Sequence, residues 1–193
     1  MIKRINILAI SGSTRASSSN LNLIKIIEEL ASDSILVTVF NELALLPQFN
    51  PDYDNEDVPE SIKLFRQQIN FADGVLICTP EYAGGVPGAL KNAIDWTVSS
   101  MEFSQKPVAL ITAATSGKFS HESLLGTLLI LETKITKEMQ FIISYIKTKI
   151  NKSGQILDKG VLEQINTLIK ALVETVNNKS GAEQLFLKPR NFN

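Results

Sequence analysis

Short apolar segments alternate with longer segments of helical spacing along this chain. The apolar segments are rich in Ile, Val and Leu and predict buried strands over 4–11, 35–40, 74–79, 107–114 and 139–147. The segments between them carry apolar residues three or four positions apart and predict helices over 21–31, 61–72, 89–100, 124–135 and 160–176. Residues 41–60, which contain three prolines, are predicted to form an irregular connection, and 181–193 are left unassigned.

The alternation of strands and helices indicates the fold class. Strands that are apolar on both faces, separated by amphipathic helices, are typical of a parallel sheet covered on both sides. Five such units favour a flavodoxin-like, doubly wound α/β fold with strand order 2-1-3-4-5; the order follows from the fold type rather than from any residue. A chain of 193 residues suits one buried core, so we expect a single domain over 1–193.

Charge and composition narrow the possible partners. The 19 Lys and Arg residues nearly balance the 20 Asp and Glu residues, which gives no electrostatic reason to expect nucleic acid or an acidic membrane surface. The single cysteine, Cys78, and single histidine, His121, exclude an intrachain disulfide and argue against a metal site. Cys78 is interpreted as a small apolar strand residue. No apolar run is long enough for a signal peptide or a membrane span, so we expect a cytoplasmic protein.

The predicted fold also predicts where a ligand would bind. In open α/β sheets, ligands bind beyond the carboxyl ends of the strands, where the connections diverge to opposite faces. For this strand order that point lies between the first and third strands. The loops at that edge are 12–20, 79–88 and 114–120, and these three loops also have the most unusual composition of the chain.

The first loop, "GSTRASSSN", combines several features of an anion site. Gly12 permits a tight turn, and Arg15 offers a planar fork of donors with a permanent charge. Hydroxyl donors come from four serines: Ser13, Ser17, Ser18 and Ser19. The next helix begins near Ser19 or Asn20, so its free N–H groups point back into the loop. These features predict a phosphate cradle; the alternative is a helix cap within a solvated turn.

The second loop, "TPEYAGGVPG", predicts a rigid slot. Pro80 and Pro87 stiffen its ends, Gly84 and Gly85 expose backbone amides, and Tyr82 offers a wall or a stacking surface. The alternative is a purely structural loop with an exposed aromatic side chain. A phosphate cradle beside a flat slot suits a flat heteroaromatic monophosphate, and FMN has that shape.

The third loop is a weaker candidate for ligand binding, and two common nucleotide-binding motifs are absent from the sequence. Thr115, Ser116 and Gly117 supply small donors, although this segment alone is more typical of an ordinary strand-to-helix turn. The chain contains neither G-x-G-x-x-G nor a Walker loop, so the first loop is not a dinucleotide or nucleoside-triphosphate motif.

Two motifs carry a resemblance to a known family. "GSTRASSSN" (12–20) matches the pattern G-S-x-R-x-x-S-x-N, and "PEYAGGVPGALKNAIDW" (80–96) matches P-E-Y-x-x-x-x-P-G-x-L-K-N-A-I-D-W. At these residues the sequence resembles the NAD(P)H-dependent FMN reductases of flavodoxin-like fold. Enzymes described as quinone, azo-dye and chromate reductases are among them. The resemblance extends over most of the chain through the order of its elements.

The resemblance implies roles for individual residues. The FMN phosphate or its loop would be held by Ser13, Arg15, Ser18 and Asn20, and Ser19 is a further candidate there. The isoalloxazine would lie along Pro80, Glu81, Tyr82, Ala83 and Gly84. Many members carry Asn where this chain has Ala83, so a side-chain hydrogen bond is missing at that position. Ser116 and Gly117 are included on a looser match, because "TSGKFSHES" lacks the glycines often found there.

The resemblance also implies a function. NAD(P)H would deliver hydride to bound FMN, and a small acceptor (a quinone, azo compound, free flavin or metal oxyanion) would then take two electrons. No catalytic side chain is expected, because the flavin carries the chemistry. The alternatives are a flavodoxin-type electron carrier, which the near-neutral charge disfavours, and a flavin- or nucleotide-binding regulatory module without turnover. The family commonly forms homodimers or homotetramers.

Overall fold

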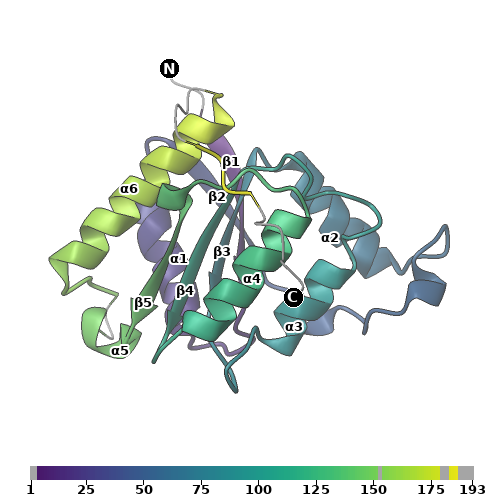
Figure 1. The fold of residues 1–193 in the computed structure, drawn as a ribbon, viewed down its shortest axis with the longest axis horizontal. Helices are drawn as coiled ribbons and strands as arrows, with labels where there is room; N and C mark the ends of the chain where they lie inside the picture. The colour runs from purple at the N-terminus through teal and green to yellow at the C-terminus, as the bar shows by residue number, and fades with distance from the viewer. Residues whose placement is uncertain (1–3, 152–153, 179–182, 187–193) are drawn as a thin grey trace, which may run out of the picture.

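The computed structural model describes residues 4–151, 154–178 and 183–186 and contains one five-stranded parallel sheet. The strand order is β2-β1-β3-β4-β5, which confirms the order expected from the sequence (Figure 1). The strands are β1 (Ile5–Ser11), β2 (Ile35–Phe40), β3 (Gly74–Thr79), β4 (Val108–Ala114) and β5 (Gln140–Ser144). The central strands β3 and β4 are buried throughout, which explains their unbroken apolar sequences.

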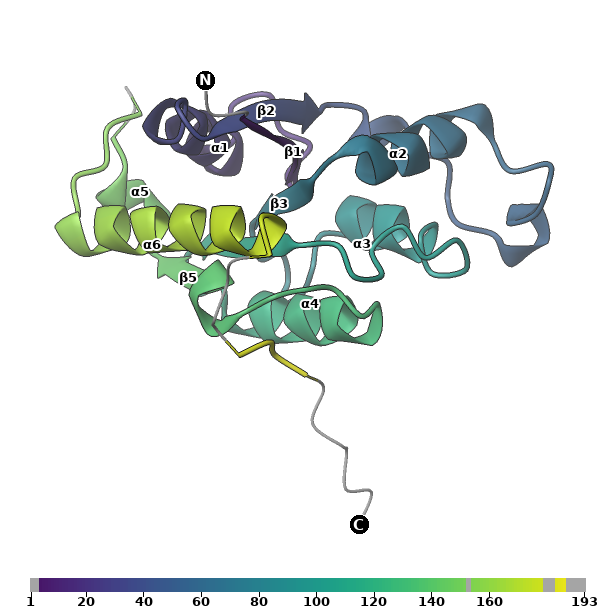
Figure 2. The same cartoon turned by 90° about the horizontal axis from the view of Figure 1, so that it is seen from above.

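Helices cover both faces of the sheet (Figure 2). The long helices are α1 (Ser19–Leu30), α2 (Glu60–Phe71), α3 (Gly88–Asp95), α4 (Lys118–Ile130) and α6 (Lys159–Val176). The short elements are α5 (Ile146–Lys149) and the 3-10 turns η1 (Leu43–Leu45), η2 (Pro51–Tyr53) and η3 (Lys137–Met139). Figure 2 shows α1 and α6 on one face and α2, α3 and α4 on the other.

The predicted helix over 124–135 was wrong at both ends, because α4 spans Lys118–Ile130. Its first turn buries the polar residues Ser120 and His121, so apolar spacing does not reveal it. The Ser120 hydroxyl donates to the Pro80 carbonyl oxygen over 3.2 Å, and His121 Nδ1 lies 2.9 Å from Thr112 Oγ1. At the other end the chain leaves the helix, and Glu132 adopts a φ of 58°.

Two further predictions ran past the true end of an element. The helix predicted over 89–100 stops at Asp95, and the following turns lead to Met101 at a φ of 61°. The strand predicted over 139–147 stops at Ser144, because Tyr145 takes the left-handed conformation with a φ of 55° and α5 follows. Ile146, read as a strand residue, is instead buried at the start of α5.

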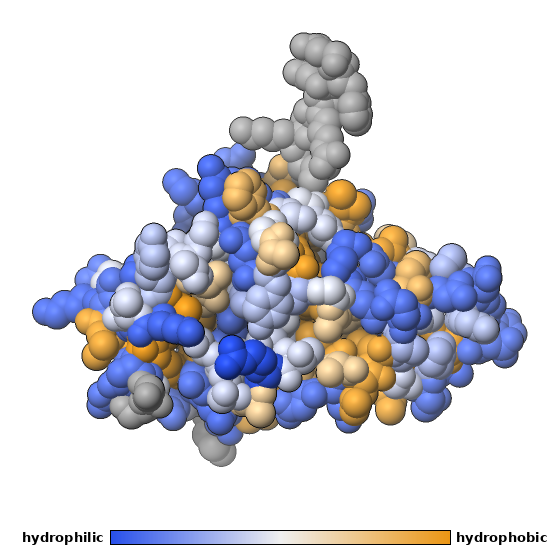
Figure 3. All heavy atoms as spheres, turned by 90° about the horizontal axis from the view of Figure 1, so that it is seen from below, coloured by the Kyte–Doolittle hydropathy of each residue, from blue (hydrophilic) through white to orange (hydrophobic). Residues whose placement is uncertain are grey.

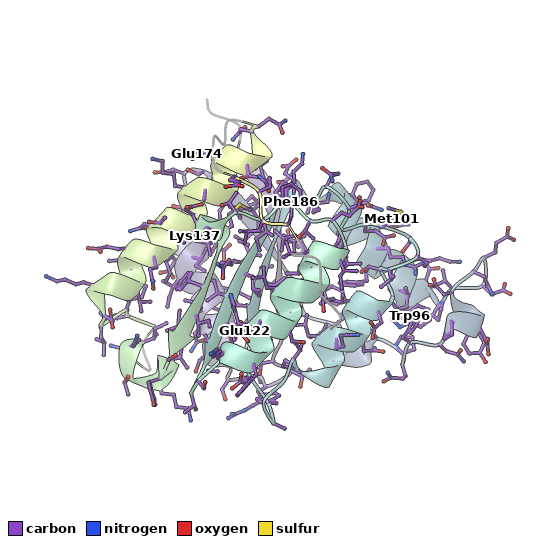
Figure 4. The ribbon with its side chains drawn as sticks, viewed as in Figure 1. Trp96, Met101, Glu122, Lys137, Glu174 and Phe186 are labelled. Carbon is purple, nitrogen blue, oxygen red and sulfur yellow. The ribbon has the colours of Figure 1, made fainter. Side chains whose placement is uncertain are left out.

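The described part of the tail packs on the body of this chain. Leu185 N donates to the Ile135 carbonyl oxygen over 2.8 Å, and Gln184 pairs with Thr136. Figure 4 shows Phe186 beside the upper end of α4, whereas the strands β4 and β5 point toward the lower edge. Leu187 and the remaining tail positions of the unassigned segment lie outside the described residues.

Within the described ranges, no helix is both long and apolar enough to cross a membrane.

Candidate cofactor site

A cavity of about 400 Å³ opens at the carboxyl edge of the sheet. Figure 3 views the molecule from this edge, and the middle of this face is mainly blue and white, the colours of hydrophilic and intermediate residues. The cavity is lined by segments that follow four of the strands: Ser13, Arg15, Ser17, Ser18, Ser19, Asn20, Pro80, Glu81, Tyr82, Ala113, Ala114, Thr115, Tyr145, Ile146, Lys147 and Thr148. The structure thus brings together the first two predicted loops.

Gly12 holds the first loop tightly against β3. Its N–H donates to the Cys78 carbonyl oxygen over 2.8 Å. A Cβ at this position would lie 2.3 Å from Thr79 Oγ1 and 2.8 Å from Thr79 Cβ, so only glycine permits the approach. The predicted tight turn is therefore also a close contact between the first loop and the strand that leads into the second.

A pair of hydroxyl groups joins the first two loops. Ser13 Oγ lies 3.3 Å from the Tyr82 hydroxyl, and it also accepts a hydrogen bond from Arg15 N over 3.4 Å. Ser13 is buried, whereas the Tyr82 side chain is about half exposed along the cavity. The two predicted parts of the site are in direct contact.

The amino end of α1 contributes a capped terminus and an unpaired acceptor. Ser18 caps the helix, because its Oγ accepts from Asn20 N over 3.2 Å. Asn20 is 3% exposed, and its Nδ2 donates to the Ala113 carbonyl oxygen over 3.3 Å. Among the described residues, its buried Oδ1 has no hydrogen-bond partner. An unpaired buried acceptor in a cavity wall is costly, so the site favours a ligand with a donor there.

Arg15 supplies positive charge to the cavity. Its backbone is fixed by Ser13, while its side chain is exposed and lines the cavity. In the part of the chain that the structure describes, no carboxylate lies within ion-pair distance of its guanidinium. A guanidinium without a protein partner suits an anionic ligand.

The second loop turns tightly at Ala83 and Gly84. Tyr82 and Gly85 exchange two backbone hydrogen bonds of 3.1 and 2.9 Å, and the residues between them have φ angles of 49° and 68°. Asn tolerates this left-handed conformation better than Ala. The Asn that many members of the resembled family carry here is therefore favoured by the backbone as well as by any hydrogen bond. Ala83 and Gly84 are exposed and do not line the cavity.

Glu81 ties the second loop to α4. Its carboxylate accepts from Gly117 N over 3.3 Å and from Ser120 N over 2.9 Å, so it satisfies free N–H groups at the start of that helix. Gly117 is buried at a φ of 92°, with its N–H already engaged, and the exposed Ser116 accepts at its carbonyl oxygen from Ser144 Oγ. Neither Ser116 nor Gly117 lines the cavity, so their assignment to the cofactor remains a prediction.

Several residues in or just before the second motif have structural roles. Lys91 and Asp95 form an ion pair across one turn of α3, with 2.5 Å between Nζ and Oδ1. Trp96 is fully buried, and its Nε1 donates to the Pro47 carbonyl oxygen over 2.9 Å. Cys78 is also fully buried, and burial raises the pKa of its thiol, so it is not a nucleophile.

Sequence reasoning missed one wall of the cavity. The cavity lining includes four residues that follow β5, namely Tyr145, Ile146, Lys147 and Thr148. The segment "ISYIK" was read as the continuation of a strand, because no Gly, Asn or Pro marks the turn at Tyr145. The carboxyl end of the fifth strand lies at the same edge as the others, and that was the available signal.

Comparison with known proteins matches residues 5–148 to a family described as NADPH-dependent FMN reductase. The quinone reductase of Escherichia coli (strain K12) is 28% identical over 183 residues, covering 91% of this chain and 97% of that protein. An NAD(P)H-dependent FMN reductase of Pseudomonas aeruginosa is 32% identical, covering 92% and 98%. The flavoenzyme NAD(P)H:(acceptor) oxidoreductase FerB from Paracoccus denitrificans has the same fold, with a TM-score of 0.73, 23% identity, and coverage of 91% and 98%.

Proposed function

Because the chain belongs to the NADPH-dependent FMN reductase family, we propose that it transfers hydride from NAD(P)H to bound FMN and then two electrons to a quinone-like acceptor. FMN is its cofactor and NAD(P)H its co-substrate, as in that family. The observation that carries the proposal is a cavity in which a cationic loop, a helix N-terminus and an orphaned acceptor converge.

The residues present fit FMN. Arg15 and the serine hydroxyls of the first loop would hold the phosphate, together with the free N–H groups at the start of α1. Asn20 Oδ1 would accept from a ligand hydroxyl, and the ribityl chain of FMN carries such donors. Tyr82 would lie along the flavin, held in place by its contact with Ser13.

The protein's part in the reaction is binding and orientation. Bound FMN would supply the redox chemistry, namely uptake of a hydride from NAD(P)H and release of two electrons to an acceptor that also takes up protons. Glu81 fixes the second loop to α4, and Ser13 fixes the same loop to the first, so the slot is held from two sides. This chain's own residues need supply no nucleophile, which agrees with the burial of Cys78.

Support for a quinone as the acceptor comes from relatives rather than from the cavity. The Escherichia coli relative is named a quinone reductase, and it aligns over nearly the whole of both chains. We also propose that the protein forms a homodimer or homotetramer, as the family resemblance implies.

An anaerobic titration tests the function. The purified protein should show the visible absorbance of bound flavin, which NADH or NADPH should bleach and a benzoquinone should restore. The nucleotide that bleaches at lower concentration identifies the physiological reductant. Bound flavin that neither nucleotide reduces would favour a flavodoxin-type carrier. A protein that binds no added FMN would favour the regulatory module and contradict the proposed function.

A further inference from the structure

The wall that the sequence did not reveal carries a second cation. Lys147 lies in the first turn of α5 and lines the same cavity as Arg15, and in the sheet β3 and β4 separate β1 from β5, the strands that lead to these two residues. In the described ranges of the chain, its ammonium has no carboxylate within ion-pair distance. Lys149, two residues further along α5, lies instead 3.7 Å from Asp158 and lines a different cavity.

The position of Lys147 is fixed by its neighbours in the fold. Tyr145 N donates to the Thr115 carbonyl oxygen over 3.2 Å, which ties the turn to the end of β4. The Ile146 side chain is 6% exposed and anchors the turn in the core. Thr148 donates to the Tyr145 carbonyl oxygen through both its N–H and its hydroxyl, each over 2.9 Å. The backbone that carries Lys147 is therefore held against the cavity rather than free in solvent.

One cation in the cavity wall does not balance the charge of a phosphate monoester. A phosphate monoester carries a charge between about −1.5 and −2 near pH 7. Arg15 contributes one positive charge, and the Glu81 carboxylate in the same cavity wall works against an anion. With Lys147 included, two unpaired cations face a ligand that carries nearly two negative charges.

We propose that Lys147 is a second cationic ligand of the FMN phosphate, and that it makes the site prefer FMN over riboflavin. This inference rests on the proposed function, because it assumes that FMN occupies the cavity. Arg15 would bind the phosphate from the side of α1 and Lys147 from the side of α5. The phosphate would then bridge the β1–α1 loop and the β5–α5 turn.

The test compares flavin affinities of apoprotein variants by quenching of flavin fluorescence. Lys147→Gln should weaken FMN binding roughly three- to tenfold and leave riboflavin binding unchanged, because riboflavin lacks the phosphate. Lys149→Gln removes the same charge from the same short helix and serves as the control, with FMN binding unchanged. In about 0.5 M salt, the difference between Lys147→Gln and the wild type should shrink, because the ion pair is partly exposed.

Each outcome decides the inference. An unchanged FMN dissociation constant in Lys147→Gln would overturn it while leaving the proposed function intact. Equal losses for FMN and riboflavin, or equal losses in Lys147→Gln and Lys149→Gln, would also overturn it, because they indicate a disturbed turn rather than a phosphate contact. A wild-type protein that binds neither flavin would overturn the proposed function itself. Circular dichroism of both variants checks that each is folded.

Discussion

Arg15 is the charged residue of the first loop, and its guanidinium has no protein partner among the described residues. Arg15→Ala should weaken FMN binding by about 10- to 100-fold, because a hydrogen bond to a charged group contributes roughly 1.5–3 kcal/mol. Fluorescence titration of apoprotein with FMN measures the effect. Arg4→Ala, which removes an exposed arginine before β1 at the opposite edge of the sheet, should have no effect. Equal FMN affinity in Arg15→Ala and wild type would refute the phosphate cradle.

Ala83 is exposed and sits at a φ of 49°, in a conformation that disfavours residues with a Cβ. Ala83→Asn should raise the free energy of unfolding by about 0.5–1 kcal/mol, since Asn visits this conformation more readily. Ala83→Val should lower it, because β-branched residues fit the left-handed region worst. Urea denaturation of the three proteins gives the order. Identical midpoints for the Asn and Val variants would contradict the backbone explanation.

At the level of elements, α4 connects the site to a buried histidine. His121 lies one residue after Ser120, whose N–H Glu81 binds. Its Nδ1 contacts Thr112 Oγ1, and its Nε2 contacts Gln140 Oε1. Burial lowers the pKa of His121 below its ordinary value of 6.5, although the hydrogen bond to Gln140 and the charge of Glu122 act in the opposite direction. Figure 4 shows Glu122 on α4, the helix that carries His121.

This histidine should make stability depend on pH in a defined direction. Because its pKa is lower in the folded state, the unfolded chain takes up the proton first as the pH falls below about 6.5. The free energy of unfolding should therefore decrease between pH 7.5 and 5, by at most about 1.4 kcal/mol per pH unit. His121 is the only histidine of the sequence, so His121→Gln should flatten this slope. Urea midpoints across this range measure it, and equal slopes would contradict the assignment.

The elements that could be predicted are those whose pattern is local. β3 and β4 are buried on both faces, and their continuous apolar sequences therefore predict buried strands. The first turn of α4 was missed because its buried polar groups, Ser120 and His121, are satisfied by residues from other elements. Such partners leave no periodic pattern in the sequence.

The same distinction applies to the site. Its first loop and the part of the second from Pro80 to Tyr82 carried small, charged or rigid residues and were found to line the cavity. The β5–α5 turn was missed because Tyr145 adopts a left-handed backbone without the glycine or asparagine that usually marks one. FMN binding by these residues stays a prediction, which titration of the Arg15→Ala and Lys147→Gln variants tests.

At the scale of the whole molecule, apolar side chains remain exposed on α4. Phe119 and Ile130 are each 64% exposed in the single chain. Exposed apolar residues of this size favour association when they form a continuous surface. We predict that light scattering after size exclusion will give the mass of a dimer or tetramer at micromolar concentration. A mass of one chain throughout the concentration range would contradict the proposed association.

The two cations in the cavity wall lie far apart in the sequence, at positions 15 and 147. The loop that carries Arg15 follows the first strand, whereas the turn that carries Lys147 follows the last. During synthesis, the ribosome releases the loop well before the turn, since chains emerge from the amino end. A nascent chain therefore presents the phosphate loop before the β5–α5 turn exists, and if Lys147 binds the phosphate as proposed, its affinity for FMN should rise when the fifth strand joins the sheet.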